Sequence, residues 1–428
     1  MTNCIDNTSA PIFVAIDIAK HRHDVLVKHT DGTTQSFKVA NTSEDFTRFK
    51  EYLESLPERC QMAFEPTADY HRAMAWYLVQ AGFDVRLVSS VACARTREAI
   101  FNSRDKNDPK DAKVILHLME TGITQRYYDP LANGNHDLQE LANTYAVIVY
   151  RRAQLLHSLK NHYLTLYFPE IERYFKSTRA AWFMRTFHHF PTPASIRALD
   201  EADFVAQAWA LIGKKHNKLQ WLKDLYATAG SSVGLPIAAD SVAIDMYRTV
   251  ISEYAHMTEL RDRLEQRTSA LLQDDPDFIN LRSIPGVGPI VALIVLAEAG
   301  DLRRFKHHRQ FLKFCGLDLA TDQSGQSRGQ TRLSKRGNAR LRYAFWMAAN
   351  RAIMMNENTF RAKYQRYIRD DPYNADTKRK ARTAVAAKMA RVAYAVVKHG
   401  ATYRPYHESG IPGGKIPLAR AVAALTTS

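Results

Sequence analysis

The sequence predicts an α/β layer domain followed by two mainly helical domains. Within the first 130 residues, short β-rich apolar runs alternate with segments of helical periodicity, as in a sheet covered by helices. After that point apolar residues recur at spacings of three and four, which indicates helices. A chain of 428 residues is too long for one ordinary core. We expect domains at 1–130, 131–275 and 276–402, and a tail at 403–428.

The composition excludes wholesale disorder and points to a polyanionic partner. Hydrophobic residues make up 46% of the chain, the formal net charge is +15 and the pI is near 9.5. Such a basic chain favours nucleic acid or an anionic membrane surface. No apolar run approaches the roughly 20 residues of a membrane span, and the N-terminus lacks the basic-then-apolar order of a signal peptide. We therefore expect a cytoplasmic, nucleoid-associated protein that binds nucleic acid.

The cysteines are scattered and contain no CxxC pair, so neither a zinc site nor a disulfide framework is expected. We interpret them as reduced, partly buried thiols. They are Cys4, Cys60, Cys93 and Cys315.

A strand and a hairpin are predicted at the start of the first domain. The run Ile12–Ile18, IFVAIDI, is interrupted only by Asp17, and the following HDVLVKHTDGTTQSFKV alternates around Asp31 and Gly32. A charge inside a buried strand costs free energy unless it is paired or coordinated. Asp17 is therefore the first candidate for a functional site, and an aspartate that caps the next turn is the alternative.

A second acid follows the next predicted strand. The run Gln61–Phe64 ends at Glu65 and Pro66, so the glutamate lies at the carboxyl end of the strand, where open α/β sheets place their sites. The chain then predicts a helix, a strand and a second helix. These are expected at His71–Ala81, Asp84–Ser89 and Ala94–Phe101.

Two more acids open the following helix, in NDPKDA before KVILHLM. Pro109 suits a first helical turn, so Asp108 could cap the helix, and Asp111 lies one turn later on about the same side. A cap and a solvated acidic turn are the alternative for this pair alone. With Asp17 and Glu65, however, they form a set of acids of the kind that binds Mg²⁺ and leaves positions open for phosphate oxygens. Without a metal, four such carboxylates would repel one another.

The second domain is predicted to be a helical spacer. Asp137–Tyr167 and Val242–Leu272 have apolar residues three or four apart, so we expect an antiparallel helical pair or an intermolecular coiled coil. The aromatic-rich ERYFKSTRAAWFMRTFHHF between them could stack on bases, but a helical core is the commoner explanation. Residues 200–240 suggest no function.

The third domain begins with a predicted helix, turn and helix. The segment Leu281–Leu293, LRSIPGVGPIVAL, resembles a helix-hairpin-helix motif, whose glycine N–H groups hold the DNA backbone. A tight structural turn is the alternative. Helices with small residues suited to close packing follow at Tyr343–Ile353 and Thr377–Lys398, and Gly400 is expected to cap the second.

Asp322–Arg342 carries the chemistry of this domain. Its sequence, DQSGQSRGQTRLSKRGNARLR, sets small hydroxyl residues among Arg and Lys, with glycines that allow close approach of a ligand. We expect it to contact phosphate, and an activated hydroxyl there could attack phosphorus. Ser334 is expected to cap the helix after Gly337. The predicted nucleic-acid contacts are Gly286, Gly288, Arg328, Arg332, Lys335, Arg336 and Arg340.

Taken together, AIDIAK, FEPT, NDPKDA and the later SG and SKRGNARLR segments resemble the IS110-family transposases, which include the Piv-type DNA invertases. The resemblance runs from about Phe13 to about His399. It implies an N-terminal RuvC-like domain, an RNase H-type fold whose Asp-Glu-Asp-Asp tetrad binds Mg²⁺. It also implies a coiled-coil domain that assembles oligomers and a C-terminal domain with a serine nucleophile in a Ser-Gly step.

By matching motifs, the resemblance places the nucleophile at Ser324, before Gly325, with Ser327 as a neighbouring hydroxyl. Asp105 is the substitute for either of the last two acids of the tetrad. The tetrad itself falls on Asp17, Glu65, Asp108 and Asp111.

The function implied is DNA cleavage and strand exchange through a covalent phosphoserine. The implied partners are donor and target DNA, a structured bridge RNA, and further copies of the chain in a dimer or tetramer. One alternative is a RuvC-like Holliday-junction resolvase or an invertase that uses water or acts without an RNA guide. A non-catalytic nucleic-acid-binding scaffold is the alternative from another class.

Overall fold

The computed structural model forms two compact units, Met1–Gly134 and Asn135–Ser428. The unit boundary lies near the expected one at 130, whereas the segments expected as separate domains at 131–275 and 276–402 belong to one unit. The structure describes residues 11–101, 108–129, 135–172, 181–213, 216–324, 327–356 and 358–405. Only the backbone is described at 108–109, 181, 216–217, 321–324 and 327–330.

The first unit is built on a six-stranded mixed sheet with the order β3-β2-β1-β4-β5-β6. The first three strands are antiparallel, β4 and β5 run parallel to β1, and β6 is an antiparallel edge. This arrangement fits the RNase H-type fold that the resemblance implies. The strands are β1 Ile12–Asp17, β2 Arg22–Lys28, β3 Thr34–Ala40, β4 Cys60–Phe64, β5 Asp84–Leu87 and β6 Gln125–Arg126.

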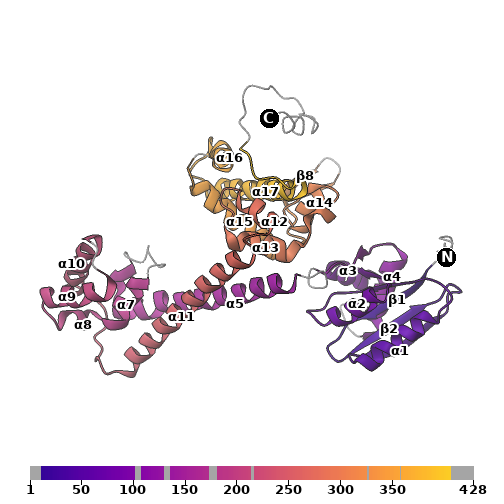
Figure 1. Ribbon diagram of the computed structural model, residues 1–428, viewed down its shortest axis with the longest axis horizontal. Coiled ribbons are helices and arrows are strands. Elements are labelled where there is room, and N and C mark those ends of the chain that lie inside the picture. Colours follow the sequence, from indigo (N-terminus) through magenta and orange to yellow (C-terminus); the bar gives the residue numbers. More distant parts are fainter. Residues whose placement is uncertain are drawn as a thin grey trace. The chain divides into compact units, whose positions relative to one another are not determined.

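Helices cover both faces of this sheet (Figure 1). Because successive strand residues point to opposite faces, Val14 and Ile16 join a core with α1 and α2, whereas Ala15 and Ala63 join a second core with α3 and α4. The helices are α1 Ser43–Glu54, α2 His71–Gln80, α3 Ser90–Phe101 and α4 Asp108–Glu120.

The predicted hairpin and strands of this unit are confirmed within one or two residues. In the hairpin turn, the Asp31 carboxylate accepts a hydrogen bond of 2.8 Å from the Thr33 N–H, and Gly32 has φ of +87°. The third helix begins at Ser90, four residues before the predicted start. The reason is that the Ser89 hydroxyl accepts a hydrogen bond of 3.1 Å from the Ala92 N–H and so starts the helix earlier.

A pair of long helices opens the second unit, and Figure 1 shows α5 and α11 side by side. Tyr145 of α5 donates a hydrogen bond to Glu265 of α11 at 3.0 Å. About two helical turns further along α5, Arg152 donates to Thr258 of α11 at 2.9 Å. The residue numbers of the contacts fall along α11 as they rise along α5, so the two helices are antiparallel. This confirms the predicted antiparallel helical pair. The elements are α5 His136–Ser158, its π-helical and α-helical continuations η2 Leu159–Leu164 and α6 Thr165–Tyr167, and α11 Val242–Leu271.

Four shorter helices form a separate core with η2 and α11. Phe183 and Phe187 are buried there, and Trp182 meets Trp221 edge to face at 4.8 Å. The described aromatic residues from Trp182 to Phe190 therefore take part in a core, as the structural alternative predicts. Within 200–240, residues of α9 and α10 such as Phe204 and Leu225 belong to the same core. The helices are α7 Ala181–His189, α8 Pro193–Arg197, α9 Glu201–Ile212 and α10 His216–Gly230.

The remaining helices surround α13, which is apolar on every side and buried. Alanine residues on α15 and α17 allow the close packing that was predicted, and Gly400 ends α17 in the left-handed region with φ of +60°. The elements are α12 Pro276–Arg282, α13 Pro289–Ala299, η4 Leu302–Arg304, α14 His308–Phe314, β7 Leu319–Ser324, β8 Ser327–Leu333, α15 Ala339–Met354, α16 Thr359–Ile368 and α17 Ala375–His399.

The prediction of a tail from residue 403 is wrong at its first residue. The Tyr403 N–H donates to the Ser283 hydroxyl at 2.7 Å, and its ring stacks on Phe360 at 5.7 Å. The rest of the expected tail, from 406, lies outside the described residues.

The thiols of Cys60, Cys93 and Cys315 are free and buried, as expected, whereas Cys4 lies outside the described residues. None of the described helices combines the length and apolar character needed to cross a membrane.

Candidate active site

Two of the predicted acids lie side by side at the end of the sheet. The parallel register pairs Ile16 of β1 with Phe64 of β4, so Asp17 and Glu65 are neighbours at the carboxyl ends of adjacent strands. Strand alternation directs Asp17 to the face of Ala15, which α3 and α4 cover. The backbone therefore brings the positions of Asp17 and Glu65 to the same end of the sheet.

Asp111 reaches the same region from α4, which packs on β1, β2 and β4. Its side chain is buried, with 3% of the residue exposed. The Arg97 guanidinium donates to one Asp111 oxygen, with Nε at 2.8 Å and Nη2 at 2.6 Å. Sequence reasoning missed Arg97, because nothing in the local pattern distinguishes it from other arginines on exposed helix faces.

Cys93 connects these acids. It is buried on α3, and its pKa is raised to about 12, first by burial and then by the Glu65 carboxylate, to which the thiol is hydrogen-bonded. Asp111 also raises the Cys93 pKa and Arg97 lowers it. All four side chains therefore share one electrostatic environment on the α3 and α4 side of the sheet.

Asp108 is the first residue of α4, so it begins the helix and does not precede it as a cap. Asp111 follows one turn later, as predicted. The side chain of Asp108, and the whole of the alternative acid Asp105, lie outside the described residues.

The donor chemistry of this edge suits Mg²⁺, which prefers carboxylate oxygens and keeps several water ligands. Among the described side chains, however, no three acids, histidines or cysteines are grouped closely enough to hold a metal ion. Asp111 is paired with Arg97. Asp17, Glu65 and Asp111 would hold the ion if Asp111 exchanged this partner for it.

The predicted nucleophile lies on a hairpin that was not predicted. β7 and β8 are antiparallel, and the register pairs Ser324 with Ser327, so Ser324 is the last residue of its strand at the tip of the hairpin. The pairing shifts between Thr321 and Gln323. The sequence did not predict these strands, because the segment is rich in Ser, Gln and Gly and does not alternate apolar with polar residues. The Ser324 side chain is outside the described part.

Ser334 closes the base of this hairpin. Its N–H donates to the Asp318 carbonyl at 2.9 Å, and its hydroxyl donates to the Asp318 carboxylate. The prediction that Ser334 caps the next helix is wrong, because Asn338 does so by accepting from the N–H groups of Arg340 and Leu341 at 2.9 and 3.0 Å. An N-cap side chain bonds two or three residues ahead, and Ser334 lies too far back.

Arg340 is engaged by protein groups in place of the phosphate that we expected. Its guanidinium contacts Glu298 at 2.6 Å, the Asn143 side chain at 2.6 Å and the Ala142 carbonyl at 3.0 Å. The Asn338 amide donates to the same Glu298 carboxylate at 2.6 Å. These contacts join the start of α15 to α13 and α5.

The other predicted basic contacts lie on the outer surface. Arg332, Lys335 and Arg336 are exposed, and Lys335 adopts the left-handed backbone with φ of +53°. The Arg342 guanidinium donates to the Lys335 carbonyl at 3.3 Å and so fixes this loop. The Arg328 side chain lies outside the described residues.

The two glycines of the predicted helix-hairpin-helix differ in their surroundings. At Gly286, with φ of +90°, an added Cβ would lie 2.4 Å from the Ala348 carbonyl oxygen of α15. Such close backbone packing is what the alternative prediction, a tight structural turn, requires at Gly286. At Gly288, which precedes α13, an added Cβ would meet no atom within 4 Å, so close packing does not require a glycine there.

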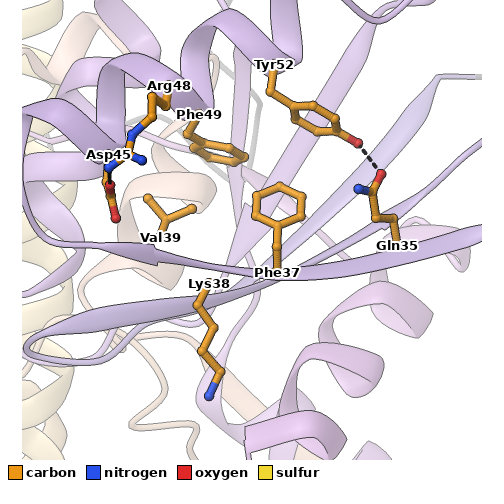
Figure 2. Close-up of a pocket in the computed structure, with 8 residues that line it drawn as sticks. All are labelled: Gln35, Phe37, Lys38, Val39, Asp45, Arg48, Phe49 and Tyr52. Atoms are coloured by element: carbon orange, nitrogen blue, oxygen red, sulfur yellow. Dashed lines mark hydrogen bonds and ion pairs between the residues drawn. The ribbon is translucent and has the colours of Figure 1, made fainter.

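A separate pocket of about 300 Å³ lies between β3 and α1 (Figure 2). Its polar groups pair within the pocket, since Tyr52 donates to Gln35 at 2.9 Å and Arg48 pairs with Asp45. None of the predicted site residues lines it, and β3 is two strands away from β1. We assign it no function.

Two family models match the chain. The model for DEDD transposases of the IS110 type, described as "Transposase", matches residues 14–169. The model described as "Transposase IS116/IS110/IS902 family" matches residues 279–365. The matched regions contain the acids of the first unit and the serine hairpin of the second. These family matches define a DNA transposase, an enzyme of DNA recombination.

Individual relatives agree over long stretches. The 44.8 kDa protein of insertion element IS116 from Streptomyces clavuligerus is 26% identical over 80% of this chain and 85% of its own length. The transposase for insertion sequence element IS1111A from Coxiella burnetii is 30% identical over 41% of this chain and 47% of its own length. This chain belongs to the IS116/IS110/IS902 family of transposases.

Among solved structures, RuvC of T. thermophilus in complex with a Holliday junction substrate matches 28% of this chain and all of its own length. The identity is 11% and the TM-score is 0.21. The strand order of the first unit and the family match indicate its RNase H-type fold.

Proposed function

We propose that this transposase moves its insertion sequence by a composite mechanism in which Ser324 attacks DNA and Asp17, Glu65, Asp108 and Asp111 hold Mg²⁺. The observation that carries the proposal is the register that sets Asp17 beside Glu65, with Asp111 on the covering helix. Acids grouped at the end of buried strands are costly unless they bind a cation. A phosphate bound there is the natural substrate.

In the proposed step, the Ser324 oxygen forms a bond to a DNA phosphorus atom. The serine hydroxyl gives up its proton as this bond forms, the bond from phosphorus to one bridging oxygen breaks, and that oxygen takes up a proton and leaves as a hydroxyl group. A hydroxyl of a second strand then displaces the serine and completes the exchange. When bound, Mg²⁺ supplies neutralisation of the charge on the phosphate oxygens. The position of Ser324 at the end of strand β7, where the hairpin turns, supports this role.

Donor and target DNA are the proposed substrates, and a structured bridge RNA is the proposed guide. The net charge of +15 and the exposed Lys335 and Arg336 support a polyanionic partner. The RNA rests on the family resemblance. Sequencing the RNA that copurifies with active protein tests it, and recovery of no discrete species from a preparation that recombines DNA would contradict it.

A dimer or tetramer is proposed as the active form. The α5 helix presents Val147 and Tyr150, which are 50% and 66% exposed, on the outside of its pair with α11. Apolar residues on the outer surface of a long helical pair suit contact with a second copy. Light scattering of the full chain measures the oligomeric state, and a monomer at working concentration would contradict this part.

The serine mechanism is tested with end-labelled DNA and Mg²⁺ on a denaturing gel. Wild type and the matched control Ser327→Ala should form a covalent protein–DNA adduct, and Ser324→Ala should form none. If Ser324→Ala cuts at the wild-type rate and neither protein forms an adduct, water is the nucleophile, as in a resolvase.

The acids are tested separately with Asp17→Ala. This variant should lose strand exchange and keep its nucleic-acid affinity, because only the metal site is removed. Exchange at the wild-type rate would show that Asp17 is not catalytic and would favour a scaffold role for the first unit.

A further inference from the structure

α15 presents a stacked aromatic pair to solvent. Tyr343 and Trp346 are 56% and 44% exposed, and their ring centroids lie 6.1 Å apart with an interplanar angle of 17°. They are three residues apart and so lie on one helix face, whereas the intervening Phe345 is fully buried. Exposed apolar residues that lie together mark binding sites more often than single exposed residues do.

The exposed face continues along the helix with polar and flexible residues. Asn350 donates from its side-chain amide to the Trp346 carbonyl at 2.9 Å, and Met354, one turn further, is 77% exposed. The spacing of Tyr343, Trp346, Asn350 and Met354 by three and four keeps them in one stripe. The stripe therefore begins at the stacked rings of Tyr343 and Trp346 and extends along α15 to Met354.

The chain segment that carries the pair has charges of one sign. From Gln323 to Asn356 the sequence contains seven Lys and Arg residues and no Asp or Glu. Lys335 and Arg336 are exposed just before α15, and Arg342, next to Tyr343, fixes the Lys335 carbonyl. The loop cations are thus held next to the helix that carries the rings, and their charge suits an anionic partner and repels a cationic one.

We propose that Tyr343 and Trp346 form a stacking site for unpaired bases of a single-stranded nucleic acid whose phosphates contact Lys335 and Arg336. Aromatic rings stack on any base, and flanking cations hold the backbone. Bases in a duplex are already stacked on each other and offer no free face, so the site selects single strands. The proposal rests on the nucleic-acid partner in the proposed function but is independent of the serine chemistry.

The test measures binding of the full-length protein to a labelled single-stranded oligonucleotide and to the duplex of the same sequence. Anisotropy at one fixed salt concentration is compared for wild type, Tyr343→Leu, Trp346→Leu and the control Trp76→Leu. Trp76 is also exposed, at 51%, but lies on α2 of the first unit. All proteins carry Ser324→Ala, so that no covalent adduct affects the affinity.

We expect each leucine variant on α15 to bind the single strand about tenfold more weakly or worse, a loss typical of one base–aromatic contact. The duplex affinity and the Trp76→Leu protein should change little. Trp346→Phe should restore binding, because it keeps a ring at the position and so separates stacking from misfolding.

Three outcomes would overturn the proposal. One is unchanged single-strand affinity in Trp346→Leu, and another is an equal loss for single strand and duplex. The third is a change from oligomer to monomer with single-strand binding intact, which would assign the rings to contact between copies. The covalent-adduct assay is a separate measurement, so failure of the serine mechanism would leave this binding result interpretable.

Discussion

At the scale of the residue, Arg97 brings a positive charge among the acids of the first unit. In its pair with Asp111, the carboxylate is buried and the Arg97 side chain is 12% exposed. Removing one member of a buried pair leaves an uncompensated charge, which costs roughly 3–5 kcal/mol. Arg97→Gln should therefore lower the free energy of unfolding by about this amount, measured by denaturant titration of the full chain.

The matched control is Arg48→Gln, whose partner is Asp45 on the surface of α1. An exposed pair is worth roughly 0–1 kcal/mol, so this variant should unfold almost as wild type does. Added Mg²⁺ should stabilise Arg97→Gln more than wild type, because the ion no longer competes with the guanidinium for Asp111. Equal stabilisation of both proteins would argue against Asp111 as a metal ligand.

His23 makes a second residue-scale prediction, on pH. It is fully buried on β2, and burial lowers its pKa from the usual value of 6.5, although Asp24 opposes the shift. The folded state therefore binds fewer protons than the unfolded state. The stability contributed by neutral His23 is complete above pH 6.5 and is lost as the pH falls below that value.

The melting temperature should thus fall as the pH is lowered from 7 toward 5. One such group changes the free energy of unfolding by at most about 1.4 kcal/mol per pH unit. His23→Gln should flatten the dependence of melting temperature on pH, and His29→Gln, on the exposed hairpin turn, is the control. An unchanged slope in His23→Gln would assign the effect to other groups.

At the scale of the element, the turn between α12 and α13 combines packing with an open helix start. Gly286→Ala places a Cβ 2.4 Å from a carbonyl oxygen of α15 at φ of +90°, so either strain or a shift of α15 follows. We expect a loss of roughly 1–3 kcal/mol or more, as for overpacking or backbone strain. Gly288→Ala should change stability by less than about 1 kcal/mol, since its Cβ meets open space.

Binding data on the same two proteins test the helix-hairpin-helix reading. If the Gly288 N–H holds a DNA phosphate, Gly288→Ala should weaken duplex binding at unchanged melting temperature, because the added methyl group crowds the approaching phosphate. If Gly288→Ala binds duplex DNA as tightly as wild type, the turn between α12 and α13 has only a packing role.

At the scale of the whole molecule, the acids and the serine lie in different compact units. The proposed mechanism requires both on one phosphate, supplied either by one copy of the chain or by two copies, and supply by two copies can be tested. Mixing Asp17→Ala with Ser324→Ala protein should then restore adduct to roughly a quarter of the wild-type level, since random exchange gives mixed dimers with one complete site. A mixture as inactive as either variant would place both halves in the same copy.

The local sequence pattern was sufficient to predict many of the strands and helices of this protein. The strands that end in Asp17 and before Glu65 follow from apolar runs and proline punctuation, and α2, α15 and α17 follow from helical periodicity. These features depend on residues close together in the chain, so the sequence is sufficient to predict them. The family resemblance rests on the same short motifs.

Contacts between distant residues were decided only by the tertiary structure. The β7–β8 hairpin has no apolar alternation and depends on pairing and on closure by Ser334 and Asp318. Arg340 in the basic segment is bound by Glu298 and Asn143, which lie on other helices. Local periodicity carries no information on such partners, because a guanidinium binds a protein carboxylate and a phosphate by the same charge-assisted hydrogen bonds. Which of the two it meets depends on where the fold brings the helices together.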